Sequence, residues 1–153
     1  MGSGTINITN RKARFKYEIL DRYEAGIALK GSEVKSVRAG GVSLAEAYCR
    51  FVVDELFLFD CHITRYPQAG THEVLPPTRP RKLLLHRSQL KRLHGQVATR
   101  GLTIVPLRIY DQDGRVKVEI GLARGKKAFD KRRTIKERDI EREERTHRRK
   151  LRL

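Results

Sequence analysis

The sequence predicts a mainly β fold, a closed antiparallel barrel with two or three short helices, followed by a basic C-terminal tail. Three observations carry this prediction. A long first strand contains a bend, several shorter segments have strand-like patterns, and a helix precedes a final hairpin. With the tail set aside, about 120 residues remain, which suits one compact domain. We expect a flexible leader over residues 1–9, the barrel over residues 10–123 and the tail over residues 124–153.

The first strand is predicted over residues 15–29. Apolar side chains alternate along it, but positions 20–21 disturb the pattern, as a bend or bulge would. Bends of this kind let a sheet curl into a barrel. Just ahead of the strand, Arg11, Lys12 and Arg14 place three positive charges within four residues. These charges are either a solvated approach to the strand or a contact for phosphate groups.

A short helix is predicted next, over residues 33–38. Ser32 is a suitable N-cap, and the glycines at 40–41 end the helix. Lys35 and Arg38 share one face of it, where they either contact RNA or belong to a surface plug at one end of the barrel.

Residues 44–63 predict two strands with a tight turn near positions 54–55. In the second of them the odd positions from Phe57 to Ile63 fall on one side, and its start is apolar on both sides, which indicates a central strand. Residues 64–80 contain four prolines and predict an irregular loop. A second basic cluster at its end includes Arg81 and Lys82.

A helix is predicted from a Ser88 N-cap to His94, with Gly95 ending it. The last folded segment is a hairpin over residues 102–123, and the Asp-Gly pair in its turn at 111–114 is a strong signal. The order is strand, helix, two strands, loop, strand, helix and hairpin. This order is typical of an OB-type barrel, a fold that often binds oligonucleotides.

The chain is strongly basic, which indicates a polyanionic partner. It has 34 Lys and Arg against 18 Asp and Glu, a net charge of +16. Fourteen of the basic and six of the acidic residues lie in the tail, so the tail holds half of the net charge. Nucleic acid fits this balance better than an acidic membrane or an acidic protein.

Other function classes find little support in the sequence. Cys49 and Cys61 are the only cysteines, and their spacing fits neither a disulfide scaffold nor a zinc site. The five histidines show no metal-ligand spacing, and Asp111 and Asp113 fit the turn that holds them. No apolar run approaches the roughly 20 residues that span a bilayer, and no signal peptide opens the chain. We therefore expect a soluble, cytoplasmic protein with no catalytic residues, metal, cofactor, small-molecule substrate or membrane partner.

Several motifs together resemble one family. They are the segments Tyr23 to Leu29, Gly31 to Gly40, Arg81 to His86 and Arg124 to Lys127, the last followed by Asp130-Lys131-Arg132. In this order they are similar to SmpB, the tmRNA-binding or SsrA-binding family. The resemblance implies an OB-type barrel that binds the tRNA-like domain of tmRNA. With elongation factor Tu and alanyl-tmRNA, the protein would act on ribosomes stalled with an empty decoding site. A structural ribosomal protein and a general RNA-binding OB module are the alternatives.

The resemblance also implies which residues bind each partner. It places Asn10, Glu24 and Leu84 at the tRNA-like domain. With the basic clusters added, the predicted tmRNA-binding residues are Asn10, Arg11, Lys12, Glu24, Lys35, Arg38, Arg81, Lys82 and Leu84. The residues predicted to bind the ribosome and its decoding site are Arg124, Lys126, Lys127, Phe129, Asp130, Lys131, Arg132, Lys136 and Arg138. Phe129 stands where members often carry Tyr or His, and Ile140 where some carry Trp.

The tail is predicted to be disordered when free and helical when bound. Thr134 and Glu137 form a capping-box pattern, so a helix can begin at Ile135. Oppositely charged pairs four residues apart add about 0.2–0.5 kcal/mol each, which leaves a helix without a packing face marginal in water. Ribosomal RNA that neutralises the charge would favour the helix.

Overall fold

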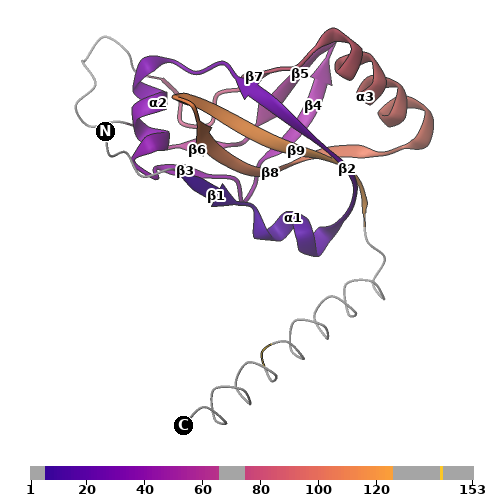
Figure 1. Cartoon of the computed structure of the whole chain (residues 1–153), viewed down its shortest axis with the longest axis horizontal. Coiled ribbons are helices and arrows are strands. Elements are labelled where there is room, and N and C mark those ends of the chain that lie inside the picture. The colour runs from indigo at the N-terminus through magenta and orange to yellow at the C-terminus, as the bar shows by residue number, and fades with distance from the viewer. Residues whose placement is uncertain (1–5, 66–74, 126–141, 143–153) are drawn as a thin grey trace.

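The structure is a computed structural model that describes residues 6–65, 75–125 and Arg142 (Figure 1). Its helices are α1 (Arg11–Lys16), α2 (Gly31–Arg38) and α3 (Arg87–Arg100). Its strands are β1 (Asn7–Thr9), β2 (Tyr17–Ile27), β3 (Val42–Ser43), β4 (Tyr48–Val52), β5 (Glu55–Phe59), β6 (His62–Ile63), β7 (Arg81–Leu84), β8 (Thr103–Gln112) and β9 (Arg115–Gly125).

The main sheet has seven antiparallel strands in the order β1-β8-β4-β5-β7-β2-β9, and β9 also pairs with β8. Strands β3 and β6 form a separate pair. Figure 1 shows α2 and α3 at opposite ends of the sheet. The prediction of a mainly β chain with a few helices is confirmed.

Two local predictions about backbone shape are confirmed. The pairing of β2 with β9 shifts register between Ile19 and Asp21, so a bulge lies where the alternation was disturbed. The hairpin of β8 and β9 turns at Asp113 and Gly114, whose φ angles are 52° and 76°. Two consecutive positive φ angles are what a tight type I′ hairpin turn requires.

The predicted boundaries of the leader and the tail are both wrong, because strands extend beyond each of them. Asn7–Thr9 was assigned to the leader but forms β1, which pairs with residues 108–110 of β8. At the other end, Arg124 and Gly125 continue β9 and pair with Glu18 and Tyr17. The helix α1 was not predicted at all. Its basic residues therefore lie on a helix rather than on an extended approach to the first strand.

The predicted starts and ends of the two other helices also change. Helix α3 runs through Gly95 and ends at Gly101, which has a φ of 63°. Its apolar face continues beyond Gly95 to Val97, which packs against the core, and this packing offsets the cost of about 1 kcal/mol for a glycine inside a helix. Neither predicted N-cap is confirmed, because α2 and α3 are preceded by Lys30 and His86.

The alternation predicted through residue 63 is wrong. Leu56 and Leu58 are buried in β5, but past Asp60, which has a φ of 55°, the buried residues are Cys61 and Ile63. The kink at Asp60 changes the phase, so even positions face the core before it and odd positions after it. The prediction of a central strand is confirmed, since β5 lies between β4 and β7.

A candidate nucleic-acid interface

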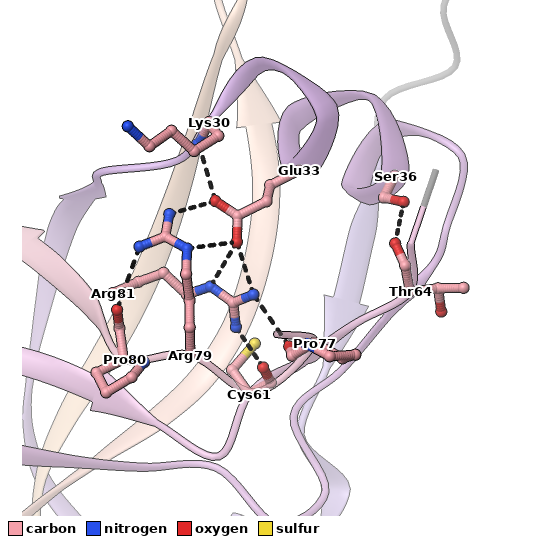
Figure 2. A network of polar contacts seen from close by, with 9 residues as sticks. All are labelled: Lys30, Glu33, Ser36, Cys61, Thr64, Pro77, Arg79, Pro80 and Arg81. Atoms are coloured by element: carbon pink, nitrogen blue, oxygen red, sulfur yellow. Dashed lines mark hydrogen bonds and ion pairs between the residues drawn. The ribbon is translucent and has the colours of Figure 1, made fainter. Parts of the chain in front are cut away.

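Helix α2 is tied to the sheet by a buried carboxylate (Figure 2). Glu33 is only 4% exposed, and its Oε2 accepts hydrogen bonds from Nη2 and Nε of Arg81 at 2.7 and 3.0 Å. Arg79 donates to both carboxylate oxygens, and the backbone N–H of Lys30 donates to Oε1 at 2.8 Å. Farther along the helix, the Ser36 hydroxyl donates to the carbonyl of Thr64. These bonds fix the position of α2.

The same network buries Arg81, which was one of the predicted tmRNA-binding residues. Arg81 is 1% exposed, and besides Glu33 it donates to the carbonyl oxygens of Cys61 and Pro77. The prediction that Arg81 contacts RNA is therefore wrong, because the side chain points into the body and its donors are occupied there. Its neighbour Lys82 is exposed and forms an ion pair of 3.2 Å with Glu55.

The environment of Glu33 keeps its carboxyl ionised. Burial alone raises the pKa of this group. The hydrogen bonds from Arg79, the Lys30 backbone and Arg81 outweigh burial, and the pKa lies below its ordinary value. A charged Glu33 is thus part of the folded structure over the neutral range of pH.

Arg38, at the far end of α2, reaches the tip of the β8–β9 hairpin. Its Nε donates to Asp111 Oδ2 at 3.2 Å, and its Nη2 donates to the carbonyl of Gly114 at 2.8 Å. Lys35 is exposed on the same helix. The anchored helix therefore holds Arg38 in a defined place rather than leaving it free in solvent.

A groove of about 590 Å³ brings three of the predicted residues together: Glu24, Arg38 and Leu84. Leu84 is 49% exposed, unusual for a leucine next to the buried Leu83. It lies opposite Gly26 in the register of β2 and β7, and a Cβ at Gly26 would come within 3.3 Å of Leu84 Cβ. The absence of a side chain at Gly26 gives Leu84 its place at the groove.

Glu24 is held by two residues of the hairpin. The hydroxyl of Tyr110 donates to its carboxylate, and Lys117 Nζ lies 3.9 Å from Oε1. Burial first, and then the hydrogen bond to Glu24, raise the pKa of Tyr110 to about 12. Tyr110 therefore keeps its proton at neutral pH and orients an exposed carboxylate that can still accept further hydrogen bonds.

The comparisons with known proteins decide the family. A family profile described as SmpB protein matches residues 7–150. The chain belongs to the SmpB family. An SsrA-binding protein of Chloroflexus aggregans is 54% identical over 144 residues, which cover 94% of this chain and 91% of the relative. Another, of Roseiflexus sp., is 57% identical over 134 residues, covering 88% and 85% of the two chains.

A solved structure is also similar to this chain, both in sequence and in fold. That structure is described as "tmRNA-SmpB: a journey to the center of the bacterial ribosome". One of its chains shares 53% sequence identity with this chain. The TM-score is 0.65, and the match covers 80% of this chain and 85% of that one. The SmpB resemblance of the sequence motifs is confirmed by these matches.

Asn10, also taken from the SmpB resemblance, lies apart from the groove. It is 7% exposed. Its side-chain amide donates to the carbonyl of Pro106 at 2.9 Å, and its backbone N–H donates to the carbonyl of Leu107 at 2.8 Å. These contacts join α1 to β8. Asn10 and Lys12 border a separate pocket of about 280 Å³. The exposed Arg11 and Lys12 lie on α1, where Lys12 pairs with Glu46 at 2.8 Å.

Of the residues that the SmpB resemblance assigns to the ribosome, the structure describes only Arg124. Arg124 lies in β9, exposed and paired with Glu18 at 2.7 Å. The other predicted ribosome-binding residues, together with the predicted tail helix, lie outside the described residues: Lys126, Lys127, Phe129, Asp130, Lys131, Arg132, Lys136 and Arg138.

Sequence reasoning missed the hairpin residues that frame Glu24. Lys117 lines the groove, and Tyr110 lies opposite it in the register of β8 and β9. In the sequence Lys117 and Glu119 alternate with Val116 and Val118, a pattern typical of a half-buried strand with one exposed face. Which residues of β2 lie opposite them follows only from the strand register.

The described residues offer no sign of other chemistry. No group of three or more His, Cys, Asp or Glu in residues 6–65 and 75–125 could hold a metal ion. Burial raises the pKa of Cys49, and burial also raises the pKa of Cys61 to about 11, so both thiols stay protonated and unreactive. No helix within the described part of the chain is long and apolar enough to cross a membrane.

Proposed function

We propose that this chain is a noncatalytic adaptor that binds the tRNA-like domain of tmRNA and brings it to stalled ribosomes. One observation carries the proposal: Glu24, Leu84 and Arg38 meet in one groove, on a body that is itself basic. Family membership supports the same partner, since the relatives are SsrA-binding proteins and the similar solved structure concerns tmRNA-SmpB on the ribosome.

The groove offers three kinds of contact to a folded RNA. Glu24 can accept hydrogen bonds from 2′-hydroxyl or base amino groups, which a protein uses to recognise RNA. Leu84 offers an apolar surface to a ribose or an unstacked base. Arg38 offers a charge to the phosphate backbone, with Lys35 beside it on α2, and such contacts set position rather than sequence.

The proposal also covers the shape of the body and its partners on the ribosome. The pairing of β9 with β8 as well as with β2 supports an OB-type barrel that closes on itself. We propose that this body replaces the missing half of a tRNA while the tail occupies the empty mRNA channel. The complex would arrive with elongation factor Tu and alanyl-tmRNA, in the cytoplasm, without a cofactor or small-molecule substrate.

The contribution of Leu84 can be tested by truncating it. Replacing Leu84 by Ala is expected to weaken binding of the tRNA-like domain roughly fivefold, because about 1 kcal/mol of apolar contact is lost. The dissociation constant can be measured by filter binding or fluorescence anisotropy. Val52→Ala is a matched control, since Val52 is 41% exposed in β4 and does not line the groove.

The two variants separate the groove from general RNA affinity. Val52→Ala should bind as the wild type does, and both variants should bind an unstructured RNA of equal length unchanged. Equal affinity of Leu84→Ala and wild type for the tRNA-like RNA would place the interface elsewhere on the molecule.

A further inference from the structure

An acidic residue lies at the centre of the outward face formed by β2, β9 and β8. Glu119 is on the middle strand, opposite Glu24 of β2 and opposite Arg108 of β8 in the register. Its two carboxylate oxygens serve different strands. Oε1 accepts from Arg22 Nη1 at 3.0 Å, and Oε2 accepts from Arg108 Nε at 3.4 Å. One carboxylate thus holds a guanidinium group on each side.

The arrangement places the acid beneath the two bases. The Glu119 side chain is 19% exposed, whereas those of Arg22 and Arg108 are 56% and 35% exposed. A ligand approaching this face therefore meets the guanidinium groups before it meets the carboxylate. Glu119 cancels one of the two positive charges but leaves the cationic groups at the surface.

Arg108 is also fixed from a second direction. Its guanidinium carbon lies 4.1 Å from the centre of the Tyr110 ring, a distance typical of a cation–π contact. Tyr110 is in turn held by its hydrogen bond to Glu24. The row from Arg22 through Glu119, Arg108 and Tyr110 to Glu24 is therefore continuous, and it ends at the groove.

These ion pairs stabilise the fold too little for stability alone to explain the arrangement. Ion pairs as exposed as these contribute about 0–1 kcal/mol each. Within the described part of the chain, each of the two guanidinium groups donates through one nitrogen only, Nη1 of Arg22 and Nε of Arg108. The remaining N–H groups are available to a ligand, and the planar fork of an arginine matches the two oxygens of a phosphate.

We propose that Arg22 and Arg108 form a clamp for the phosphate backbone of the RNA bound in the groove, with Glu119 as its positioning residue. The inference rests on the proposed function, because it extends the same RNA interface from the groove across the outward face of β2, β9 and β8. Glu119 touches no RNA in this arrangement. It sets the separation and direction of two groups that do.

The direction in which Glu119→Gln changes RNA affinity distinguishes a positioning role of Glu119 from a simple effect of its negative charge. Removing a negative charge from an RNA-binding face raises affinity for any RNA if only long-range electrostatics count. If Glu119 positions the clamp, Glu119→Gln instead weakens binding of the tRNA-like domain, roughly three- to tenfold, because Arg22 and Arg108 lose their common anchor. The full-length protein should be titrated with this RNA and with an unstructured RNA of equal length, at several salt concentrations.

Asp54→Asn is the matched control. It also removes one negative charge from the surface, but Asp54 is exposed in the turn between β4 and β5 and lies outside the lining of the groove. It should leave the preference for the tRNA-like RNA unchanged. Arg22→Gln and Arg108→Gln should each reduce the dependence of log affinity on log salt by about 1, as the loss of one phosphate contact does. These two variants test the clamp even if Glu119→Gln folds poorly.

The outcomes are distinct. Tighter binding of Glu119→Gln to both RNAs, or unchanged salt dependence in both arginine variants, would overturn the clamp. If the wild type itself failed to prefer the tRNA-like domain, the proposed function would fail first. If the wild type prefers the tRNA-like domain and Glu119→Gln keeps the same preference, the clamp is refuted and the proposed function stands.

Discussion

Replacing Glu33 by Gln is expected to lower the free energy of unfolding by about 3–5 kcal/mol, the usual cost of removing one partner of a buried ion pair. Arg81, which is 1% exposed, would keep its charge and lose the carboxylate that accepts two of its hydrogen bonds. Urea unfolding followed by circular dichroism measures the change. Glu46→Gln removes the acid of an exposed ion pair and should leave the unfolding midpoint unchanged.

The same variant should change the response to acid. The pKa of Glu33 is below its ordinary value of 4.5 in the folded chain, so its contribution to stability is complete above that value. The contribution is lost as pH falls below 4.5 and through the lower folded pKa. Wild type should therefore lose more stability than Glu33→Gln between neutral pH and the acid range. Equal losses in the two proteins, or a loss of less than 1 kcal/mol at neutral pH, would contradict the assigned role of Glu33.

Removing the residues after Gly125 is expected to abolish tagging on stalled ribosomes while leaving binding of the tRNA-like domain largely intact. The removed segment holds thirteen Lys and Arg against six Asp and Glu, a net charge of +7, and the groove residues precede it. The cut belongs after Gly125 because Arg124 and Gly125 are paired with β2. Tagging can be measured by incorporation of radiolabelled amino acids on ribosomes that have run to the end of a message.

A substituted tail gives the control for that truncation. A variant in which Lys126, Lys127, Lys131 and Arg132 become Gln keeps the length of the chain and tests the charge alone. It should also fail in tagging. Normal tagging by the truncated protein would show that the tail has no part in recognising an empty message channel.

Features that depend on neighbouring residues could be predicted from the sequence. The bulge in β2 and the turn at Asp113-Gly114 follow from a break in alternation and from residues that tolerate positive φ. The extent of α3 could not be predicted in this way. Gly95 carries a helix-ending signal, but the packing of Val97 on the core decides in favour of the longer helix.

The candidate site was predictable only in part, because burial depends on distant partners. Arg81 and Lys82 look alike in sequence, yet Arg81 is buried by an acid 48 positions away while Lys82 is exposed. Leu84 looks like core and is half exposed over a glycine of another strand. Arg22, Arg108 and Glu119 come together through strand register, which alternation along one strand does not determine.

The most direct test of the central claim is to capture the full-length protein from cells and sequence the RNA bound to it in the ribosome-free fraction. The account predicts one dominant RNA with a tRNA-like end, greatly reduced with Leu84→Ala. A mixture of RNAs in proportion to their cellular abundance, unchanged in that variant, would contradict the account.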